Sequence, residues 1–191
     1  GFSEYGSVMN TDVYTVYVEK RPDRSLSPTD AAIALREILP VPGLTALRSI
    51  VRYDVAGLDA EPFRRALDTV LSDPVSDRVH ESPIRDGYAY AFGVELLPGQ
   101  FDQHADSAEE AIEIVTGGTR PRVAVTRVFL LYGTLTATEY AAIERHIVNP
   151  IDSRVREPFG EVRFDERSGT PERVATVPAL VDETDLQRVI E

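Results

Sequence analysis

Asp73-Pro-Val-Ser-Asp-Arg-Val79 is followed 76 residues later by Asn149-Pro-Ile-Asp-Ser-Arg-Val155. The same gapless offset aligns further identical residues: Val18 with Val94, Pro22 with Pro98, Asp30 with Asp106, Ile38 with Ile114, Gly57 with Gly133 and Ala66 with Ala142. Matches held in one register along a chain are typical of an internal repeat. We therefore predict two copies of one unit, residues 13–81 and 89–157, paired on one chain as a homodimer would pair. The alternative is a convergent pattern imposed by the fold alone.

Runs rich in β-branched and aromatic residues predict three strands in each copy. These strands cover residues 13–18, 44–55 and 75–81 in the first copy and residues 88–97, 121–132 and 151–157 in the second. Residues 123–131 are apolar on both faces apart from Arg127. We expect this strand at the centre of the sheet, where the two copies meet.

Capping signals predict two helices in each copy. Ser27, followed by Pro28, is expected to begin the first helix, which ends at Pro40, and Asp59 the second. In the second copy, two capping boxes are predicted, Ser107 with Glu110 and Thr136 with Glu139. The apolar positions lie on one side of each helix: Ala31, Leu35 and Ile38; Phe63, Ala66, Leu67, Val70 and Leu71; Ala108, Ala111, Ile112 and Val115; Tyr140, Ile143 and Ile147. One-sided helices must cover a sheet, which predicts an α+β fold, a largely antiparallel sheet in a two-layer sandwich built from two tandem β-α-β-α-β units.

The predicted domain occupies residues 9–157. Residues 1–8 precede Met9 and lack the charged and apolar regions of a secretory signal, so we interpret them as an added leader. After Pro158 the periodicity is lost. We interpret residues 158–191, with the charged run 161–167, as a linker and the start of a next region, in which Thr184 would cap a helix.

Composition excludes several classes of function. The chain has 191 residues, 42% of them hydrophobic, and no cysteine. A cysteine nucleophile, a disulfide and a thiolate metal site are therefore excluded within these residues, and the composition fits a reducing compartment. The net charge of −12 repels phosphate backbones and anionic membranes, so we expect neither nucleic acid nor membrane as a partner. No apolar run reaches the roughly 18 residues of a membrane helix.

A resemblance to a known family lies in the second copy. Val94-Glu-Leu-Leu-Pro-Gly-Gln-Phe-Asp-Gln-His-Ala-Asp-Ser-Ala108 closely resembles the large, single-chain phosphoribosylformylglycinamidine synthase of purine biosynthesis. Val16-Tyr-Val-Glu-Lys-Arg-Pro22 and Arg52-Tyr-Asp-Val-Ala-Gly57 resemble the same enzyme. The likeness runs along residues 13–157, as that enzyme's N-terminal domain, and Asn149-Pro150 resembles the end of the small subunit of the multi-subunit form. That small subunit is a homodimer, and the N-terminal domain looks like two of them fused.

The resemblance implies a cytoplasmic parent enzyme that is an ATP-dependent ligase and glutamine amidotransferase, with ATP and Mg²⁺ as its cofactors. Such an enzyme transfers ammonia from a glutaminase domain to formylglycinamide ribonucleotide and so forms formylglycinamidine ribonucleotide. Its N-terminal domain is non-catalytic and docks against the synthetase and glutaminase domains. We therefore expect the present chain to be inactive alone, with no catalytic residue, cofactor or metal site of its own.

The candidate interdomain contact is a segment in the second copy whose amides the repeat does not explain. It comprises Pro98, Gly99, Gln100, Phe101, Asp102, Gln103, His104, Asp106 and Ser107. Its amide side chains suit hydrogen bonds between domains better than proton transfer, which needs a base of tuned pKa. The backbone N–H groups at a helix start also suit an anion. Carboxylates compete with such a ligand, so we expect Asp106 to cap the helix.

The three histidines give little sign of chemistry. His104 stands where we expect Arg in many relatives, and it is either a functional residue of this segment or a solvated one. We interpret His146 as structural and His80 as exposed on an edge strand. No two histidines have metal-ligand spacing on a helix.

Five arginines lie in or near the predicted strands, namely Arg48, Arg52, Arg78, Arg127 and Arg154. Arg78 and Arg154 correspond under the repeat, and we expect them to form equivalent salt bridges near Asp77 and Asp152 rather than to bind a ribonucleotide phosphate. Two rival functions are a free-standing interaction or metabolite-binding module and a small α/β hydrolase. The hydrolase lacks a Ser-His-Asp or paired-carboxylate arrangement.

Overall fold

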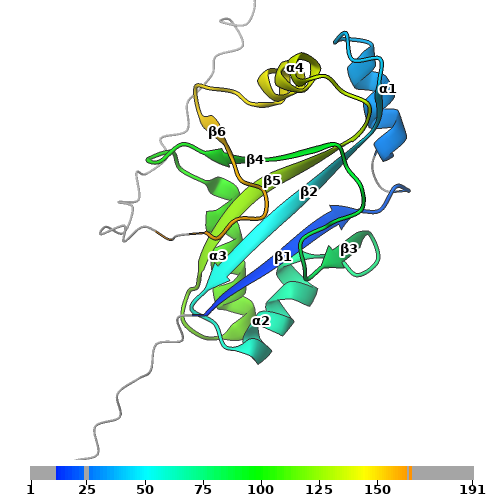
Figure 1. The fold of residues 1–191 in the computed structure, drawn as a ribbon. Helices are drawn as coiled ribbons and strands as arrows, with labels where there is room; N and C mark the ends of the chain where they lie inside the picture. Colours follow the sequence, from blue (N-terminus) through cyan, green and yellow to red (C-terminus); the bar gives the residue numbers. More distant parts are fainter. Residues whose placement is uncertain (1–11, 24–25, 163, 165–191) are drawn as a thin grey trace, which may run out of the picture.

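A six-stranded antiparallel sheet with four helices forms the fold, which is α+β as the sequence predicts (Figure 1). The computed structural model describes residues 12–23, 26–162 and 164. The elements are β1 (Val13–Lys20), α1 (Pro28–Arg36), β2 (Leu44–Ala56), α2 (Ala60–Ala66) with its π-helical continuation η1 (Leu67–Leu71), β3 (Asp77–His80), β4 (Tyr90–Leu96), α3 (Gln103–Thr116), β5 (Arg122–Gly133), α4 (Ala137–Ile147) and β6 (Ser153–Arg156). The proposed leader, residues 1–8, and the helix expected after Thr184 lie outside the described residues.

The strands lie in the order β3-β1-β2-β5-β4-β6. Every neighbouring pair is antiparallel. The pairing of β2 with β5 is the longest and joins residues 12–81, the first half, to residues 89–157, the second half. The central position predicted for residues 123–131 is therefore confirmed, and β3 and β6 are the edge strands.

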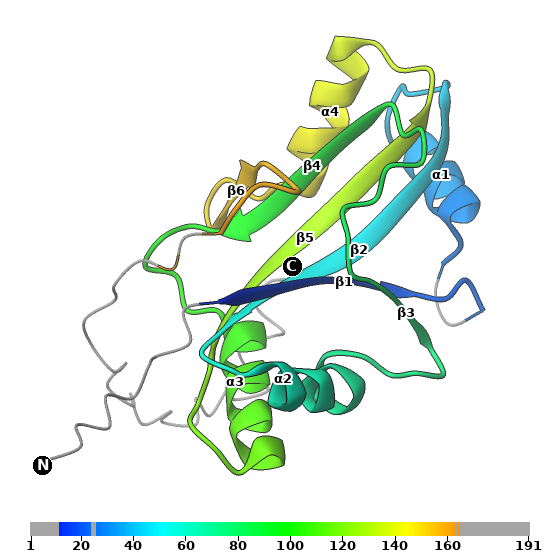
Figure 2. The same ribbon diagram turned by 60° about the horizontal axis from the view of Figure 1, so that its bottom comes forward.

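The helices cover one face of the sheet. One apolar cluster packs α2, η1 and α3 against the sheet and includes Val123 of β5. A second cluster packs α1 and α4 and includes Phe129 and Leu131 of β5. Residues an even number of positions apart on a strand point to the same face, so both clusters lie on one face, and the two helix pairs divide it between them (Figure 2).

The opposite face carries a smaller apolar cluster of Tyr17, Ile50, Val128 and Leu130. No helix of the described residues covers it. Instead, Ile84 and Tyr88 from the connection between β3 and β4, and Phe159 from the segment after β6, pack on it. The result is the two-layer α/β sandwich that the one-sided helices predict.

Two capping predictions are confirmed. The Ser27 side chain accepts a hydrogen bond from the Asp30 N–H at 3.1 Å. Thr136 and Glu139 form the full capping box, with both reciprocal hydrogen bonds present. These signals act within one turn of helix, so the local sequence is sufficient to predict them.

Two helix boundaries differ from prediction. α3 begins at Gln103, because the Asp102 carboxylate accepts the Ala105 N–H at 2.9 Å and caps the helix there. Ser107, the predicted cap, lies inside the helix. α1 ends at Arg36 rather than at Pro40, and Ile38, assigned to its apolar side, is 64% exposed.

Glycine ends both central strands in a backbone conformation that side chains disfavour. Gly57 follows β2 with φ of 91°, and Gly133 ends β5 with φ of 113°. A Cβ on Gly133 would lie 2.0 Å from the Gly43 carbonyl oxygen, so the two chain segments approach closely there. Among the described residues, no helix combines the length and the apolar character needed to cross a membrane.

Candidate functional site

The candidate contact segment, residues 98–107, divides into a turn and the first turn of a helix. The turn follows β4, where the Gln100 N–H donates to the Leu97 carbonyl at 3.1 Å and Gly99 has φ of 89°. Gln103, His104, Asp106 and Ser107 instead belong to α3. The segment is thus divided between an exposed turn and the N-terminal part of α3.

Phe101 is the exposed apolar residue of this turn, with 63% of its surface accessible. Beside it lies a hollow of about 550 Å³ between the end of β4, the start of β5 and α3. The turn residues Pro98, Gly99, Gln100, Phe101 and Asp102 line it. An exposed aromatic ring beside a hollow is a feature of protein interaction surfaces.

The acidic residues near this hollow are engaged within the chain. Asp106 and Glu109 both accept hydrogen bonds from Arg120. Glu109 also accepts the Val123 N–H at 2.9 Å, which fixes α3 against β5. Asp106 therefore pairs with an arginine, and Asp102 takes the capping role expected of Asp106. Because a carboxylate already occupies the start of α3, the structure gives no support to an anion there.

His104 contacts the sheet. Its Nε2 lies 2.7 Å from the Tyr53 hydroxyl, with the rings edge to face at 5.4 Å. Burial, and to a lesser extent the negative charges of Asp77 and Asp102, raise the pKa of Tyr53 to about 12. The phenol is therefore protonated at neutral pH, and the pair forms a hydrogen bond between α3 and β2. His104 is exposed but hydrogen-bonded, and it lies beside a hollow of about 450 Å³.

Glu19 is the centre of a charged cluster at the other end of the sheet. Arg48 donates two hydrogen bonds to its carboxylate, at 2.9 and 2.6 Å. His80 lies 3.2 Å from the same carboxylate, so the histidine expected to be exposed is partly buried on edge strand β3. Arg48 also reaches Asp86. His146 is exposed on α4.

Arg154 and Arg78 do not form the salt bridges expected from the repeat. Arg154 donates to Glu95 at 3.0 Å rather than to an aspartate. Asp77 pairs with Lys20 at 2.7 Å. Arg78 has no hydrogen bond or ion pair with any described residue. The difference arises because side chains of neighbouring antiparallel strands meet across the sheet, and β1 and β4 supply glutamates at these positions.

A buried ion pair lies on the face opposite the helices. Arg52 donates to both carboxylate oxygens of Asp54, at 2.9 and 3.0 Å, and both side chains are almost fully buried. Arg52 also donates to the Pro158 carbonyl at 3.0 Å, and Thr15 donates to Asp54 at 2.6 Å. The hydrogen bond from Arg52 to Pro158 holds the segment after β6 against the sheet. Arg52 and Asp54 are two residues apart on one strand, which is the sequence signal for a shared face.

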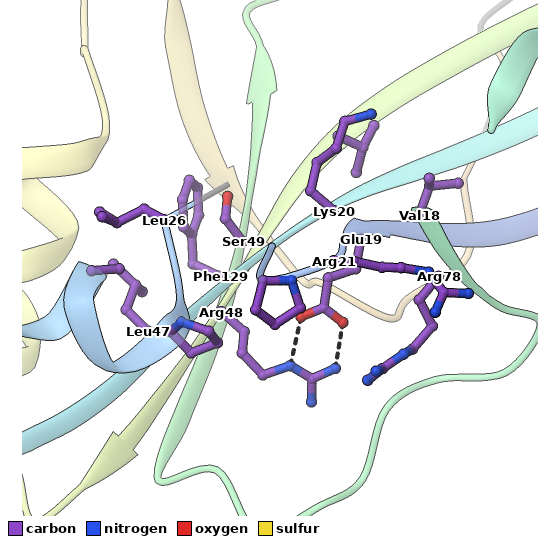
Figure 3. Close-up of a pocket in the computed structure, with 14 residues that line it drawn as sticks. Val18, Glu19, Lys20, Arg21, Leu26, Leu47, Arg48, Ser49, Arg78 and Phe129 are labelled. Atoms are coloured by element: carbon purple, nitrogen blue, oxygen red, sulfur yellow. Dashed lines mark hydrogen bonds and ion pairs between the residues drawn. The ribbon is translucent and has the colours of Figure 1, made fainter. Parts of the chain in front are cut away.

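A second hollow of about 550 Å³ lies beside β1, α1 and β2 (Figure 3). Sequence reasoning did not identify it, because its walls come from segments far apart in the chain. Apolar side chains form much of its surface, namely Val18, Leu26, Leu47, Val51 and Phe129. Lys20, Arg21 and Arg78 also line it. The adjacent cations Lys20 and Arg21, at the end of β1, are the sequence feature that could have drawn attention to this hollow.

No protein-family model matches the chain, and no match is found among curated proteins or solved structures. Within residues 12–23, 26–162 and 164, no group of three or more histidine, aspartate or glutamate side chains is placed to hold a metal ion. Several of the charged side chains at the candidate sites pair with one another, among them Glu19 with Arg48, and Asp106 and Glu109 with Arg120.

Proposed function

We propose that the chain is the N-terminal docking domain of a phosphoribosylformylglycinamidine synthase, built as a pseudo-dimer and non-catalytic alone. The parent enzyme is the cytoplasmic ligase that uses ATP, Mg²⁺ and glutamine to convert formylglycinamide ribonucleotide to formylglycinamidine ribonucleotide in purine biosynthesis. The domain organises the synthetase and glutaminase domains, which are its partners. The resemblance of residues 94–108 supports the proposed family, and the strand register of the sheet supports the proposed pseudo-dimer.

The register supports a pseudo-dimer because pairings of the first half recur 76 residues later. Tyr14 with Val55 recurs as Tyr90 with Leu131, Val18 with Val51 as Val94 with Arg127, and Lys20 with Asp77 as Leu96 with Ser153. The two halves are joined by their equivalent strands, β2 and β5. An isologous dimer joins its subunits in this manner, through the same surface on each.

The exposed apolar residues support a docking role. Ile38 and Ile114, at equivalent positions, are 64% and 74% exposed. Val75 and Ile151, also equivalent, are 71% and 82% exposed. Phe101 has a serine at the equivalent position, so it distinguishes the second half from the first. We infer that the turn around Phe101 meets the partner domains, because an aromatic anchor is a common centre of an interface.

The absence of catalysis in this domain is part of the proposal, and the pairing of its ionisable groups supports it. His104 is hydrogen-bonded to Tyr53, and His80 contacts Glu19. Such contacts hold side chains in place and suit a scaffold. The second candidate function is a free-standing interaction or metabolite-binding module, which the hollow beside Arg78 favours.

Activity measurements on the purified chain test this proposal. Glutamine hydrolysis and ATP-dependent formation of formylglycinamidine ribonucleotide are measured with the chain alone, and then with the complete product of its reading frame. We expect no turnover by the chain alone and both activities in the complete product. Turnover by the chain alone, or a complete product without either activity, contradicts the proposal.

A further inference from the structure

We propose that the hollow of about 450 Å³ beside His104 binds a small organic cation, with its ammonium group on the Asp77 carboxylate and its aliphatic stem against Val51 and Val70. The inference does not depend on the proposed function, because it requires no partner domain. Four observations lead to it: a buried carboxylate oxygen that lacks a hydrogen bond, further acceptor oxygens around the same space, apolar walls, and a contrast with the second half.

The residues of this hollow lie on the face of the sheet that the helices cover. Val18 and Tyr53 belong to the apolar cluster under α2 and α3, and Lys20 lies two residues after Val18 on β1. Asp77 stands directly opposite Lys20 in the β1–β3 register. Residues two apart on one strand, and residues directly opposite each other on antiparallel strands, point to the same face. The carboxylate, the lysine and the apolar walls therefore face one space, which η1 and His104 of α3 border.

The Asp77 carboxylate is buried, with 5% of its side chain exposed. One of its oxygens accepts the Asp73 N–H at 2.8 Å. The other, Oδ1, lies 2.7 Å from the Lys20 ammonium, but this contact lacks hydrogen-bond geometry, and no described residue donates a hydrogen bond to Oδ1. A buried acceptor without a donor is costly, so a ligand that brings a well-placed N–H group stabilises it.

Lys20 marks the position that a ligand ammonium would occupy. Its side chain is 58% exposed, so it can turn into solvent with little loss of buried surface. An ion pair with a largely exposed partner is weak. A ligand ammonium can therefore displace Lys20 from Asp77, because it adds the burial of an apolar stem to the same charge pairing.

Further oxygens around the hollow keep lone pairs for a ligand. Thr69 and Ser72 donate their hydroxyl hydrogens to backbone carbonyls of the preceding turn, each at 2.7 Å, so their oxygens remain acceptors. The Tyr53 hydroxyl shares one hydrogen with Nε2 of His104 and also keeps a lone pair. An ammonium group has three donors and no acceptor, which matches this set.

The walls of the hollow fit a short aliphatic stem. Val18 and Val51 contribute side chains from the sheet, and Val70 and Leu71 contribute side chains from η1. Val51 and Val70 are only partly buried beside the apolar cluster, so they offer surface that a ligand can cover. The volume of about 450 Å³ lies within the range of roughly 300–1,000 Å³ usual for small-molecule sites.

The equivalent positions of the second half have the opposite electrostatic character. Both carboxylates that line the hollow are replaced by neutral side chains, and two of its neutral side chains are replaced by arginine. The correspondences are Asp73 with Asn149, Asp77 with Ser153, Val51 with Arg127 and Thr69 with Arg145. In addition, α4 is a regular α-helix where the first half has the π-helical turn η1, a feature frequent at functional sites. These differences assign the cation site to the first half.

Titration of the 191-residue chain with butylammonium, followed by amide NMR shifts, tests the site. A fixed ionic strength keeps constant the general attraction of cations to a chain of net charge −12. Ammonium carries the charge without the stem, and butanol carries the stem without the charge. We expect saturable shifts at Thr69, Ser72 and Asp77 with butylammonium, and weaker binding of either control. Absence of saturation, or shifts confined to the exposed Glu61 and Asp68, would overturn the assignment.

Matched variants separate the site from general surface charge. Asp77→Asn keeps the shape of the side chain and is expected to weaken binding of butylammonium by at least roughly tenfold, as loss of a charged hydrogen-bond acceptor does. Asp68→Asn removes an exposed charge of η1 that does not line the hollow and is expected to leave the affinity unchanged. Equal losses in the two variants would contradict the proposal.

Lys20→Ala has the opposite expected effect and tests the site even if Asp77→Asn fails to fold. Removal of the competing ammonium is expected to strengthen binding of butylammonium by roughly two- to fivefold. Arg64→Ala removes an exposed positive charge of α2 outside the hollow and is expected to leave the affinity unchanged. Unchanged or weaker binding in Lys20→Ala, or an equal gain in Arg64→Ala, would overturn the proposal.

Discussion

Val51 and Arg127 lie directly opposite each other where β2 pairs with β5, and they are also the two residues that the 76-residue offset aligns. A residue that faces its own counterpart lies on the two-fold axis of a symmetric pair. The axis of the proposed pseudo-dimer therefore passes through the centre of the sheet, and the register of the β2–β5 pair determines its position.

A double-mutant cycle at this pair tests the register. Val51→Glu places a carboxylate at a partly buried position opposite the exposed Arg127, and the two charges are expected to attract by about 0.2–1 kcal/mol across the strands. The cycle combines Val51→Glu with Arg127→Gln and measures the free energy of unfolding in urea. A coupling of zero would show that the two side chains do not face each other. Val51→Glu combined with Arg122→Gln, at a distant position of β5, is the control.

The buried pair of Arg52 and Asp54 is expected to dominate the stability of the face opposite the helices. Asp54→Ala leaves the Arg52 charge buried without its carboxylate, which costs about 3–5 kcal/mol in the free energy of unfolding. Asp86→Ala removes a partly exposed partner of Arg48, which keeps Glu19, and is expected to cost less than about 1 kcal/mol. Chemical denaturation of the two variants measures the difference, and equal costs would contradict it.

Acid is expected to weaken the charged cluster around Glu19. Burial alone would raise the pKa of Glu19, but the hydrogen bonds and charge of Arg48, with His80, hold the pKa below its ordinary value of 4.5. A lowered carboxyl pKa in the folded state stabilises the fold above about pH 4.5, and the contribution is lost as pH falls through the folded pKa. The gap in unfolding free energy between the wild type and Glu19→Gln is therefore expected to narrow in acid. A gap that is independent of pH would rule this out.

The hydrogen bond between Tyr53 and His104 predicts a modest structural effect. His104→Ala is expected to lower the free energy of unfolding by about 0.5–1.5 kcal/mol, the usual contribution of one hydrogen bond. His146→Ala, at an exposed position on α4, is the control and is expected to change stability by less than about 0.5 kcal/mol. NMR titration of the Tyr53 ring is expected to show a pKa of about 12. A Tyr53 that ionises near pH 10 would contradict its burial.

Local signals were enough to predict most of the fold. Ser27 and Thr136 act on backbone groups within one turn, and the apolar strand containing Arg127 could be placed centrally because both of its faces are apolar. The prediction at Ser107 was wrong because its spacing to Glu110 matches a capping box, while Asp102 caps the helix five residues earlier. The choice between such signals depends on where β4 ends, which is a tertiary property.

The candidate sites depend on contacts that local sequence does not contain. Arg78 of β3 stands opposite Glu19 in the strand register, but Arg48 of β2 forms the hydrogen bonds with its carboxylate. The hollow beside Arg78 likewise arises from strands and a helix that are distant in sequence. For the segment of residues 98–107, the sequence identified the exposed turn but not its division between turn and helix.

The measurement that tests the proposed docking role most directly is the amount of formylglycinamidine ribonucleotide formed per glutamine hydrolysed by the complete product of the reading frame. Phe101→Ala and Gln100→Ala are expected to lower this ratio, because ammonia is lost when the domains are poorly docked, while the melting temperature stays close to that of the wild type. Ile38→Ala, which removes an equally exposed apolar side chain from the first half, is expected to leave the ratio unchanged. An unchanged ratio in Phe101→Ala, or an equal loss of both activities with a large fall in melting temperature, would contradict the account.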